Sequence, residues 1–340
     1  MSKTLVIRLS SLGDVAMLIP VLYSCAKQYP QEEFLLITKK PLLSIFEHKP
    51  PNVSVSPVDA KNEYKGIRGL RRLINDLRKQ NIENVADTHD VLRSKIIRAY
   101  FGFRGKKVAV INKERKKRKT LIRKNHKILQ PLKTSFERYH EVFRSLGYNF
   151  PIDFKSIFEF GTRDFDQIKH VAGAKTNTWI GIAPLAKHKG KVYPFEKMSQ
   201  VIELLTSDSD KTIFLFGGKN EQSQLSQLAN PYSNVISILD KKLTFSTELL
   251  LMSYLDAMIT MDSGNMHLAS LAGTPVISIW GATHPYAGFY GYNQNPDNAV
   301  QAELFCRPCS IYGHKPCYRN NYECMELINS KMIVSKLKNK

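Results

Sequence analysis

A short segment near the start of the sequence places a carboxylate where a predicted strand gives way to a helix. The stretch IRLSSLGDVAMLIP, residues 7–20, passes through two serines to Gly13 and Asp14, and an apolar periodic segment follows. A carboxylate at such a turn can take a proton from a bound hydroxyl group, or it can cap the helix. Asp14 is therefore a candidate catalytic residue, and helix capping is the structural alternative.

The densest group of candidate residues lies in MITMDSGNMHLASLAGTPVISIWG, residues 258–281. A predicted strand leads to Asp262, Ser263 and Gly264, where a helix begins. The first N–H groups of that helix would cradle an anion such as phosphate, and His267, one turn later, could bond the same ligand. Alternatively, Asp262 or Ser263 only caps the helix and His267 only packs.

Two further loops place polar groups after predicted strands. The segment APLAKHKGKVYPFEKMSQ, residues 183–200, includes Lys187 and Lys191, either of which could balance the charge of a diphosphate. Glu221, after FLFGG, could accept hydrogen bonds from a ribose or lie in the first turn of its own helix. Three loops at one sheet edge favour a binding site more than any single loop does.

Two common nucleotide-binding signatures are missing from the sequence. No Gly-x-Gly-x-x-Gly follows the first predicted strand, and GGKNE, residues 217–221, is not a P-loop, which needs Gly-x4-Gly-Lys-Ser/Thr. Dinucleotide redox chemistry and ATPase chemistry therefore lose their strongest support.

The elements that must position these residues alternate between strands and helices. Strands are predicted at Thr4–Leu9, Phe34–Thr38, Val53–Pro57, Asn84–Asp87, Lys107–Ile111, Trp179–Ala183, Thr212–Phe216, Val235–Ile238, Ala257–Met261 and Val276–Trp280. Helices are predicted after Asp14, with a kink or restart at Pro20, and at Ile67–Gln80, Val91–Phe101, Phe195–Thr206, Glu221–Leu228, Ser246–Tyr254 and Asn265–Leu271. This α/β pattern predicts a parallel sheet in each half, with ligands beyond the carboxyl ends of the strands.

The length of 340 residues suits two domains. We expect an N-terminal domain at 1–160, a linker near 150–176, a C-terminal domain at 175–325, and a tail at 326–340 that packs back on the N-terminal domain. No apolar run reaches the roughly 18 residues of a membrane span, and the N-terminus lacks the features of a signal peptide. A cytoplasmic protein is therefore expected.

The net charge of +20 is concentrated in one region. Between Arg93 and Lys127 there are fifteen lysines and arginines and one acid, Glu114. The run KERKKRKTLIRKNHK, residues 113–127, could be a solvated loop, a nucleic-acid patch, or a surface for anionic lipid or phosphorylated glycan. A nucleic-acid patch would favour interleaved aromatics, which are absent between Phe103 and Phe136.

Four of the five cysteines lie close together near the C-terminus, at Cys306, Cys309, Cys317 and Cys324. This spacing leaves open a structural zinc site or four reduced thiols in a compact loop. Disulfides are disfavoured in a cytosolic chain.

The two longest motifs together resemble the ADP-heptose:lipopolysaccharide heptosyltransferases. They are IRLSSLGDVAMLIPVL at the N-terminus and ITMDSGNMHLASLAGTPVISIWGATHP at 259–285. Lesser matches are DTHDVLRS at 87–94, KVYPFEKM at 191–198, with Tyr193 where tryptophan is common, and the cysteine cluster. The resemblance extends from about Thr4 to Met325.

The resemblance implies a GT-B architecture, in which two Rossmann-like domains face a cleft, and an inverting transfer that needs no metal or other cofactor. ADP-heptose would be the donor substrate. Asp14 would be the general base and Lys191 would stabilise the leaving diphosphate. The implied donor-binding residues are Lys187, Glu221, Leu243, Asp262, Ser263, Gly264 and His267. The segment AKHKG upstream of Lys191 departs from the family pattern, which leaves the contacts near Ala186–His188 in doubt.

The acceptor implied by the resemblance is the phosphorylated lipid A–core of lipopolysaccharide. Candidate acceptor-binding residues are Ser11, Gly13, His89, Arg93 and Arg98. The basic run, expected on the acceptor domain, would hold the enzyme at the anionic inner membrane as a peripheral protein, and no nucleic-acid partner is expected. Two alternatives remain: the same fold acting on another nucleotide sugar, or a non-catalytic protein that binds anionic glycan or nucleic acid.

Overall fold

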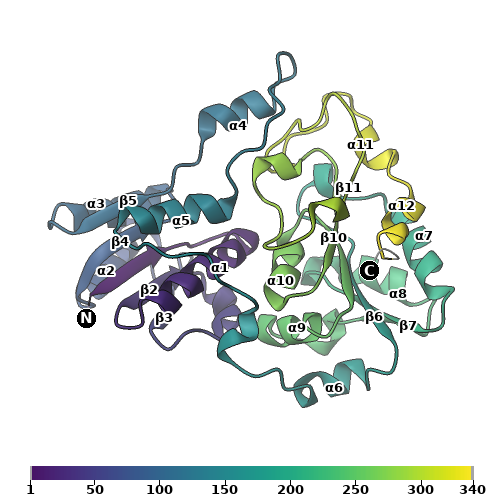
Figure 1. Ribbon diagram of the computed structural model, residues 1–340, viewed down its shortest axis with the longest axis horizontal. Helices are drawn as coiled ribbons and strands as arrows, with labels where there is room; N and C mark the ends of the chain where they lie inside the picture. Colours follow the sequence, from purple (N-terminus) through teal and green to yellow (C-terminus); the bar gives the residue numbers. More distant parts are fainter. Residues whose placement is uncertain (1, 338–340) are drawn as a thin grey trace. The chain divides into compact units, whose positions relative to one another are not determined.

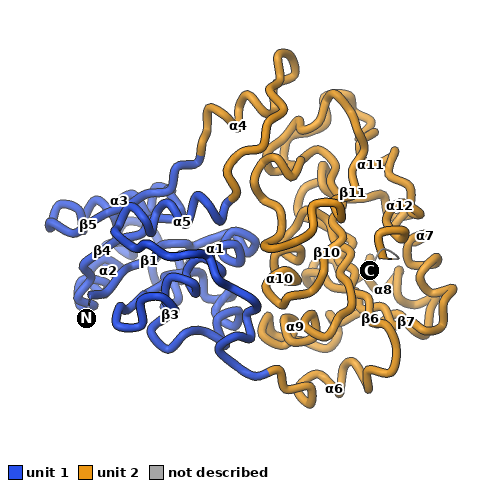
Figure 2. Tube along the Cα trace, viewed as in Figure 1, with its two compact units in different colours: residues 1–113, 135–162 blue, residues 114–134, 163–340 orange. Residues whose placement is uncertain are grey.

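The computed structural model describes residues 2–337 and divides the chain into two compact units (Figures 1 and 2). The first unit comprises Met1–Lys113 and Ser135–Thr162, and the second comprises Glu114–Thr134 and Arg163–Lys340. Each unit is an α/β sandwich around one parallel sheet, as the alternating pattern predicts. The expected domain boundary near residue 160 agrees with this division, but the expectation that 114–134 belongs to the first domain is wrong.

The sheet of the first unit has five parallel strands in the order β3-β2-β1-β4-β5. The strands are β1 (Lys3–Ile7), β2 (Glu33–Thr38), β3 (Val53–Pro57), β4 (Ile82–Asp87) and β5 (Lys107–Val110). Ile7 pairs with Ile37 on one side and with Asp87 on the other. The segments that follow β1 and β4 therefore leave the sheet together at its carboxyl edge.

Helices cover both faces of this sheet (Figure 1). α1 (Leu12–Gln28) and α5 (Ser135–Ser145) pack together on one face, and α2 (Gly66–Arg78) and α3 (Leu92–Gly102) pack together on the other. Short 3-10 helices lie at Lys40–Phe46 and Ile157–Phe160. Successive side chains of a strand point to opposite faces of the sheet and so meet different helices. Leu5 and Ile7 belong to the core beneath α2 and α3, whereas Phe34 contacts Phe143 of α5.

α1 runs from Leu12 to Gln28 through Pro20 without a break, so the expected restart at this proline is wrong. Every residue from Val15 to Ala26 is buried, and this packing on all sides holds the helix where the missing N–H of proline weakens it.

The sheet of the second unit has six parallel strands in the order β11-β10-β9-β6-β7-β8. The strands are β6 (Thr178–Ala183), β7 (Lys211–Leu215), β8 (Val235–Ser237), β9 (Ala257–Met261), β10 (Val276–Trp280) and β11 (Ala299–Gln301). The α-helices are α4 (Arg115–Leu121), α6 (Asp166–Ala172), α7 (Phe195–Thr206), α8 (Gln222–Ala229), α9 (Phe245–Met252), α10 (Gly264–Ala272), α11 (Glu323–Glu326) and α12 (Ser330–Ser335). Short 3-10 helices lie at Lys189–Lys191, Lys219–Glu221, Leu239–Lys241, Pro285–Ala287 and Pro296–Asn298.

The C-terminal tail belongs to the core of the second unit, so the expectation that it packs on the N-terminal domain is wrong. α12 packs against α7, and Ile328 and Ile333 are fully buried among side chains of the second sheet. Burial of these two apolar side chains stabilises the tail in this position. Residues 338–340, the end of the expected tail, lie outside the described residues.

Side chains of the basic segment 114–134 tie it to the second unit. Lys127 Nζ donates hydrogen bonds to the carbonyl oxygens of Phe305 at 3.1 Å, Cys306 at 2.8 Å and Pro308 at 3.0 Å. Arg118 adds a hydrogen bond to the hydroxyl of Tyr312 at 2.7 Å. These contacts assign the densest part of the basic run to the second unit. None of the described helices is both long and apolar enough to cross a membrane.

Candidate active site

The carboxylate of Asp14 is held by three donors at the carboxyl edge of the first sheet. Its Oδ2 lies 2.7 Å from Nη2 of Arg8, and it accepts hydrogen bonds from the Ser11 hydroxyl at 2.7 Å and the Ser11 N–H at 3.1 Å. Ser11 is the N-cap of α1, and Asp14 is the third helical residue. The bond to the Ser11 N–H is a capping contact, so the capping role does exist, and 27% of the carboxyl side chain still faces solvent.

Arg8 is a site residue that the sequence analysis missed. It follows β1 and is buried, with Nη1 donating to the carbonyl oxygen of Thr88 at 2.5 Å and its guanidinium 5.7 Å from the ring centre of Tyr139. The sequence does contain a pattern that points to Arg8, because an arginine at the end of a buried apolar strand requires an anionic or carbonyl partner. Asp14, six residues later, supplies that partner.

Opposing influences set the protonation of Asp14. Burial raises the pKa of its carboxyl group, but the charge of Arg8 and the hydrogen bonds from Ser11 and Arg8 outweigh burial, and the pKa lies below its ordinary value. The group is therefore ionised at neutral pH and can accept a hydrogen bond from a ligand hydroxyl.

His89 lies beside this carboxylate edge as a neutral imidazole. Burial, with the charges of Arg8 and Lys113, lowers the pKa of His89 to about 4. Its Nδ1 accepts from the N–H of Leu9 at 3.4 Å, and its Nε2 lies 3.5 Å from the hydroxyl of Ser10. Of the expected acceptor residues, His89, Ser11 and Gly13 are thus near Asp14.

The other two acceptor candidates are engaged within the first unit. Arg98 Nη1 contacts the buried carboxylate of Asp87 at 2.8 Å and that of Asp90 at 3.1 Å. Arg93 Nη1 donates to the carbonyl oxygen of Tyr64 at 2.9 Å. Both arginines therefore have structural partners that the sequence pattern does not indicate.

In the second unit, the loops after β6 and β9 bring Lys191 and Asp262 together. Lys191 Nζ lies 2.7 Å from Asp262 Oδ2, and 4% of the Asp262 side chain is exposed. Gly313 makes room for this lysine, because a Cβ there would lie 2.6 Å from Lys191 Cγ. The loops after β6 and β9 therefore meet at one edge of the second sheet.

The N-terminus of α10 lies directly after Asp262. Ser263 is its N-cap residue, and the Ser263 hydroxyl is 3.2 Å from that of Thr260, so this side chain turns toward the strand instead of capping the helix. Gly264 is the first helical residue, and His267, one turn later, is buried. The geometry at Ser263 leaves the first N–H groups of α10 available for an anion.

The remaining donor candidates lie on neighbouring loops of the second sheet. Glu221 Oε2 accepts from the N–H of Gly218 at 2.7 Å, which caps its own helical turn. Lys187 is exposed in the loop after β6, and Leu243 is half-buried just before α9. Because β6, β7, β8 and β9 are parallel, these loops share the carboxyl edge with α10.

The four C-terminal cysteines line one small cavity together with Arg307. Arg307 is buried, with Nε 2.5 Å from the Gly281 carbonyl oxygen and Nη2 3.0 Å from that of Thr283. Within residues 2–337, no group of three or more histidine, cysteine, aspartate or glutamate side chains is arranged to hold a metal ion. Arg307, a buried cation, lines the cavity beside the cysteines.

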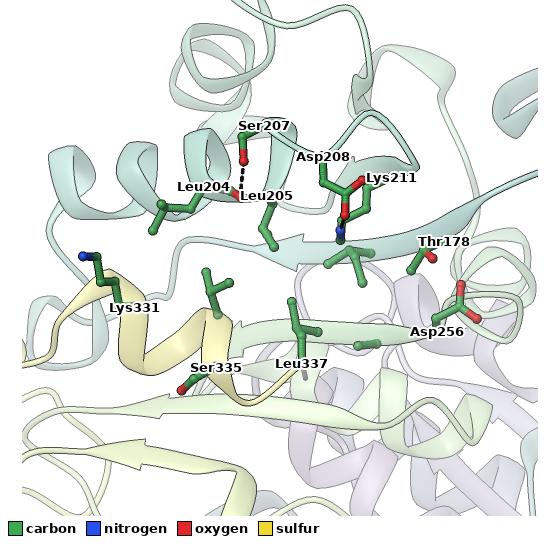
Figure 3. A pocket seen from close by; sticks show the side chains of 13 residues that line it. Thr178, Leu204, Leu205, Ser207, Asp208, Lys211, Asp256, Lys331, Ser335 and Leu337 are labelled. Carbon is green, nitrogen blue, oxygen red and sulfur yellow. Dashed lines mark hydrogen bonds and ion pairs between the residues drawn. The ribbon is translucent and has the colours of Figure 1, made fainter. Parts of the chain in front are cut away.

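A larger pocket of about 850 Å³ lies at the opposite end of the second sheet (Figure 3). Thr178, Lys211 and Asp256 line it at the starts of strands, and Leu204 and Leu337 approach from α7 and the end of α12. Because the candidate residues follow strand ends, this pocket is separate from the site.

Comparison with known proteins places the chain in a family. The model of glycosyltransferase family 9 (heptosyltransferase) matches residues 70–318. Lipopolysaccharide heptosyltransferase 1 of Pseudomonas aeruginosa is 24% identical over 321 residues, covering 90% of this chain and 86% of that protein. Lipooligosaccharide heptosyltransferase 2 of Campylobacter jejuni is 24% identical over 334 residues, covering 96% of this chain and 95% of that protein.

A solved structure supports the architecture. The E. coli heptosyltransferase WaaC with ADP superposes with a TM-score of 0.70 at 18% identity, covering 99% of each chain. This likeness confirms the expected GT-B fold. The chain belongs to glycosyltransferase family 9, the heptosyltransferase family.

Proposed function

We propose that this protein transfers heptose from ADP-L-glycero-β-D-manno-heptose to the inner core of lipopolysaccharide, either Kdo-lipid A or an already heptosylated core. The observation that carries the proposal is the ionised carboxylate of Asp14, held by Arg8 and Ser11 at the carboxyl edge of the first sheet. Membership of the heptosyltransferase family supports it, as do the names of the relatives.

In the proposed reaction, Asp14 accepts the proton of an acceptor hydroxyl while the hydroxyl oxygen attacks the anomeric carbon of the heptose. The bond from that carbon to the diphosphate oxygen breaks, ADP leaves, and configuration at the carbon inverts. A single displacement of this kind needs one base and a group that receives the leaving charge. Asp14 supplies the first.

The leaving diphosphate would be received by the second unit. The Lys191 ammonium and the first N–H groups of α10 offer positive charge, and Asp262 holds Lys191 in place at 2.7 Å. Lys187, Glu221, Leu243, Ser263 and His267 would contribute further donor contacts. We propose that these groups, without a metal ion, offset the charge that builds on ADP.

We further propose that the protein works at the cytoplasmic face of an anionic inner membrane, where a lipid-anchored acceptor would be found. The net charge of +20 supports an anionic partner. The acceptor itself would be phosphorylated.

The test measures nucleotide release by mass spectrometry. ADP-heptose and UDP-sugars are each supplied with and without detergent-solubilised Kdo-lipid A, to the wild type and Asp14→Asn. ADP release that needs both ADP-heptose and acceptor, and falls at least about 100-fold in Asp14→Asn, supports the proposal. Asp153→Asn, an exposed carboxylate of the same unit, is the matched control and should keep full turnover.

Two outcomes would contradict it. Release from a UDP-sugar with none from ADP-heptose would retain a glycosyltransferase but reject the heptosyl donor. Undiminished turnover in Asp14→Asn would reject Asp14 as the base.

A further inference from the structure

The outward face of α3 carries a stripe of apolar side chains that point to solvent. Leu92 is 76% exposed, Ile96 42% and Phe103, directly after the helix, 92%, while Ala99 between them is also exposed. Their spacing of four, three and four residues puts all four on one helical face. The opposite face, with Ser94, Ile97 and Phe101, is buried against the sheet, so α3 is apolar on two sides.

α2 carries a further exposed apolar side chain. It lies beside α3 on the same face of the first sheet, and the bond from Arg93 to the Tyr64 carbonyl oxygen joins the start of α3 to the segment before α2. Ile67, in the first turn of α2, is 88% exposed. Large apolar side chains exposed to this degree, and gathered on neighbouring helices, mark an interaction surface.

The charge around the stripe identifies the class of partner. α2 carries four arginines and α3 carries three basic residues, against one acid, Asp76. Arg68, Arg71, Arg72, Arg78 and Lys95 are exposed. Exposed apolar side chains on α3, together with exposed cations on α2 and α3, fit a bilayer with anionic headgroups, where the apolar side chains enter the acyl boundary and the cations meet phosphate. A second copy of the chain would bring like charges together.

We propose that the α3 stripe, Leu92, Ile96, Ala99 and Phe103, docks the first unit on an anionic lipid bilayer. The position of the helix fits this role, because α3 begins three residues after His89, at the sheet edge that holds Asp14. If the proposed function holds, this docking would bring the sheet edge that carries Asp14 close to the bilayer. The sugars of a lipid-anchored acceptor could then reach Asp14. The docking itself does not depend on that function.

The first test is sedimentation with vesicles of phosphatidylethanolamine and phosphatidylglycerol, 3:1, at low and physiological salt. Leu92→Gln/Phe103→Gln should bind at least about tenfold more weakly than the wild type, because two large apolar side chains no longer enter the lipid. Leu327→Gln/Met332→Gln, which removes two exposed apolar side chains of the second unit, is the matched control and should bind as the wild type does. Equal binding of both variants would overturn the proposal.

A second measurement does not rely on loss of binding. Phe103→Trp should be quenched by brominated phosphatidylglycerol vesicles, whereas the native Trp179 and Trp280, both fully buried, should not. Met332→Trp serves as the unquenched control. Quenching at residue 332 but not at 103 would overturn the proposal.

Solution mass separates lipid from protein partners. A monomeric wild type agrees with lipid docking. A wild type that is dimeric, with Leu92→Gln/Phe103→Gln monomeric and vesicle binding unchanged, would make the stripe a protein interface instead. These assays contain no sugar donor or acceptor, so their failure is distinct from failure of the proposed transferase activity, which Leu92→Gln/Phe103→Gln should retain with a water-soluble acceptor.

Discussion

Nη2 of Arg8 lies 2.7 Å from Oδ2 of Asp14, so the candidate base is paired with a buried guanidinium before any ligand arrives. This pairing lowers the pKa of Asp14 and makes the carboxylate a weak base toward an alcohol. In the proposed reaction, proton transfer to Asp14 would therefore come late in the attack, as the forming bond to the sugar carbon acidifies the hydroxyl. Arg8 thus holds the Asp14 carboxylate in place and lowers its pKa.

Replacing Arg8 should shift the pH dependence of turnover. In Arg8→Gln, burial remains while the cation is lost, so the pKa of Asp14 rises and the carboxylate ionises only at higher pH. The acidic limb of the kcat/KM profile should move upward by about one pH unit. Arg8→Lys keeps the charge and should move the limb less. An unshifted limb in Arg8→Gln would show that Arg8 does not tune this base.

The fold could be predicted from the sequence because buried parallel strands are apolar runs between turn signals. Val53–Pro57, Ala257–Met261 and Val276–Trp280 agree with the structure at both ends. β11 was missed because three residues, Ala299–Gln301, are too short for a periodic signal. α5 was also missed, although Phe136, Tyr139 and Phe143 follow a helical spacing.

The site could be predicted where its residues follow strand ends, as Asp14 and Asp262 do. The partners of those residues could not, because they depend on packing between distant segments. No local pattern connects Gly313 with Lys191, or Lys127 with the carbonyl oxygens of residues 305–308. The contacts of Lys127 assign the basic segment to the second unit, whereas the sequence-based prediction assigns it to the first domain.

The Lys191–Asp262 pair should separate activity from stability. Lys191→Met leaves the buried carboxylate of Asp262 without its cation and should lower the free energy of unfolding by about 3 kcal/mol. Lys191→Met/Asp262→Asn removes both charges and should recover most of that stability, while turnover stays at least about 100-fold below wild type. Urea unfolding and nucleotide release measure the two quantities. Recovery of activity in the double variant would contradict a role for Lys191 in leaving-group stabilisation.

Gly313 should be needed to position Lys191. Its φ of +74° disfavours a side chain, and a Cβ there would lie 2.6 Å from Lys191 Cγ, so Gly313→Ala should displace the lysine and reduce kcat about tenfold or more. Gly273→Ala is the matched control: its φ is +82°, and no described atom lies within 4 Å of the added Cβ. Both variants should lose about 1 kcal/mol of stability, but only Gly313→Ala should lose turnover.

Glu248 should make the stability of the second unit depend on pH. It lies half-buried in the first turn of α9, and burial raises its pKa to about 7. Folding therefore favours the protonated form, and this group destabilises the fold increasingly as pH rises from about 4.5 to about 7. Glu248→Gln, which stays neutral, should raise the Tm by about 3 °C or more at pH 8 and leave it unchanged at pH 4. Glu196→Gln, at an exposed position in the first turn of α7, is the matched control and should show no such gain, because its carboxylate remains in water. A Tm difference for Glu248→Gln that is equal at both pH values would contradict the assignment, since a packing effect of the amide would not depend on protonation.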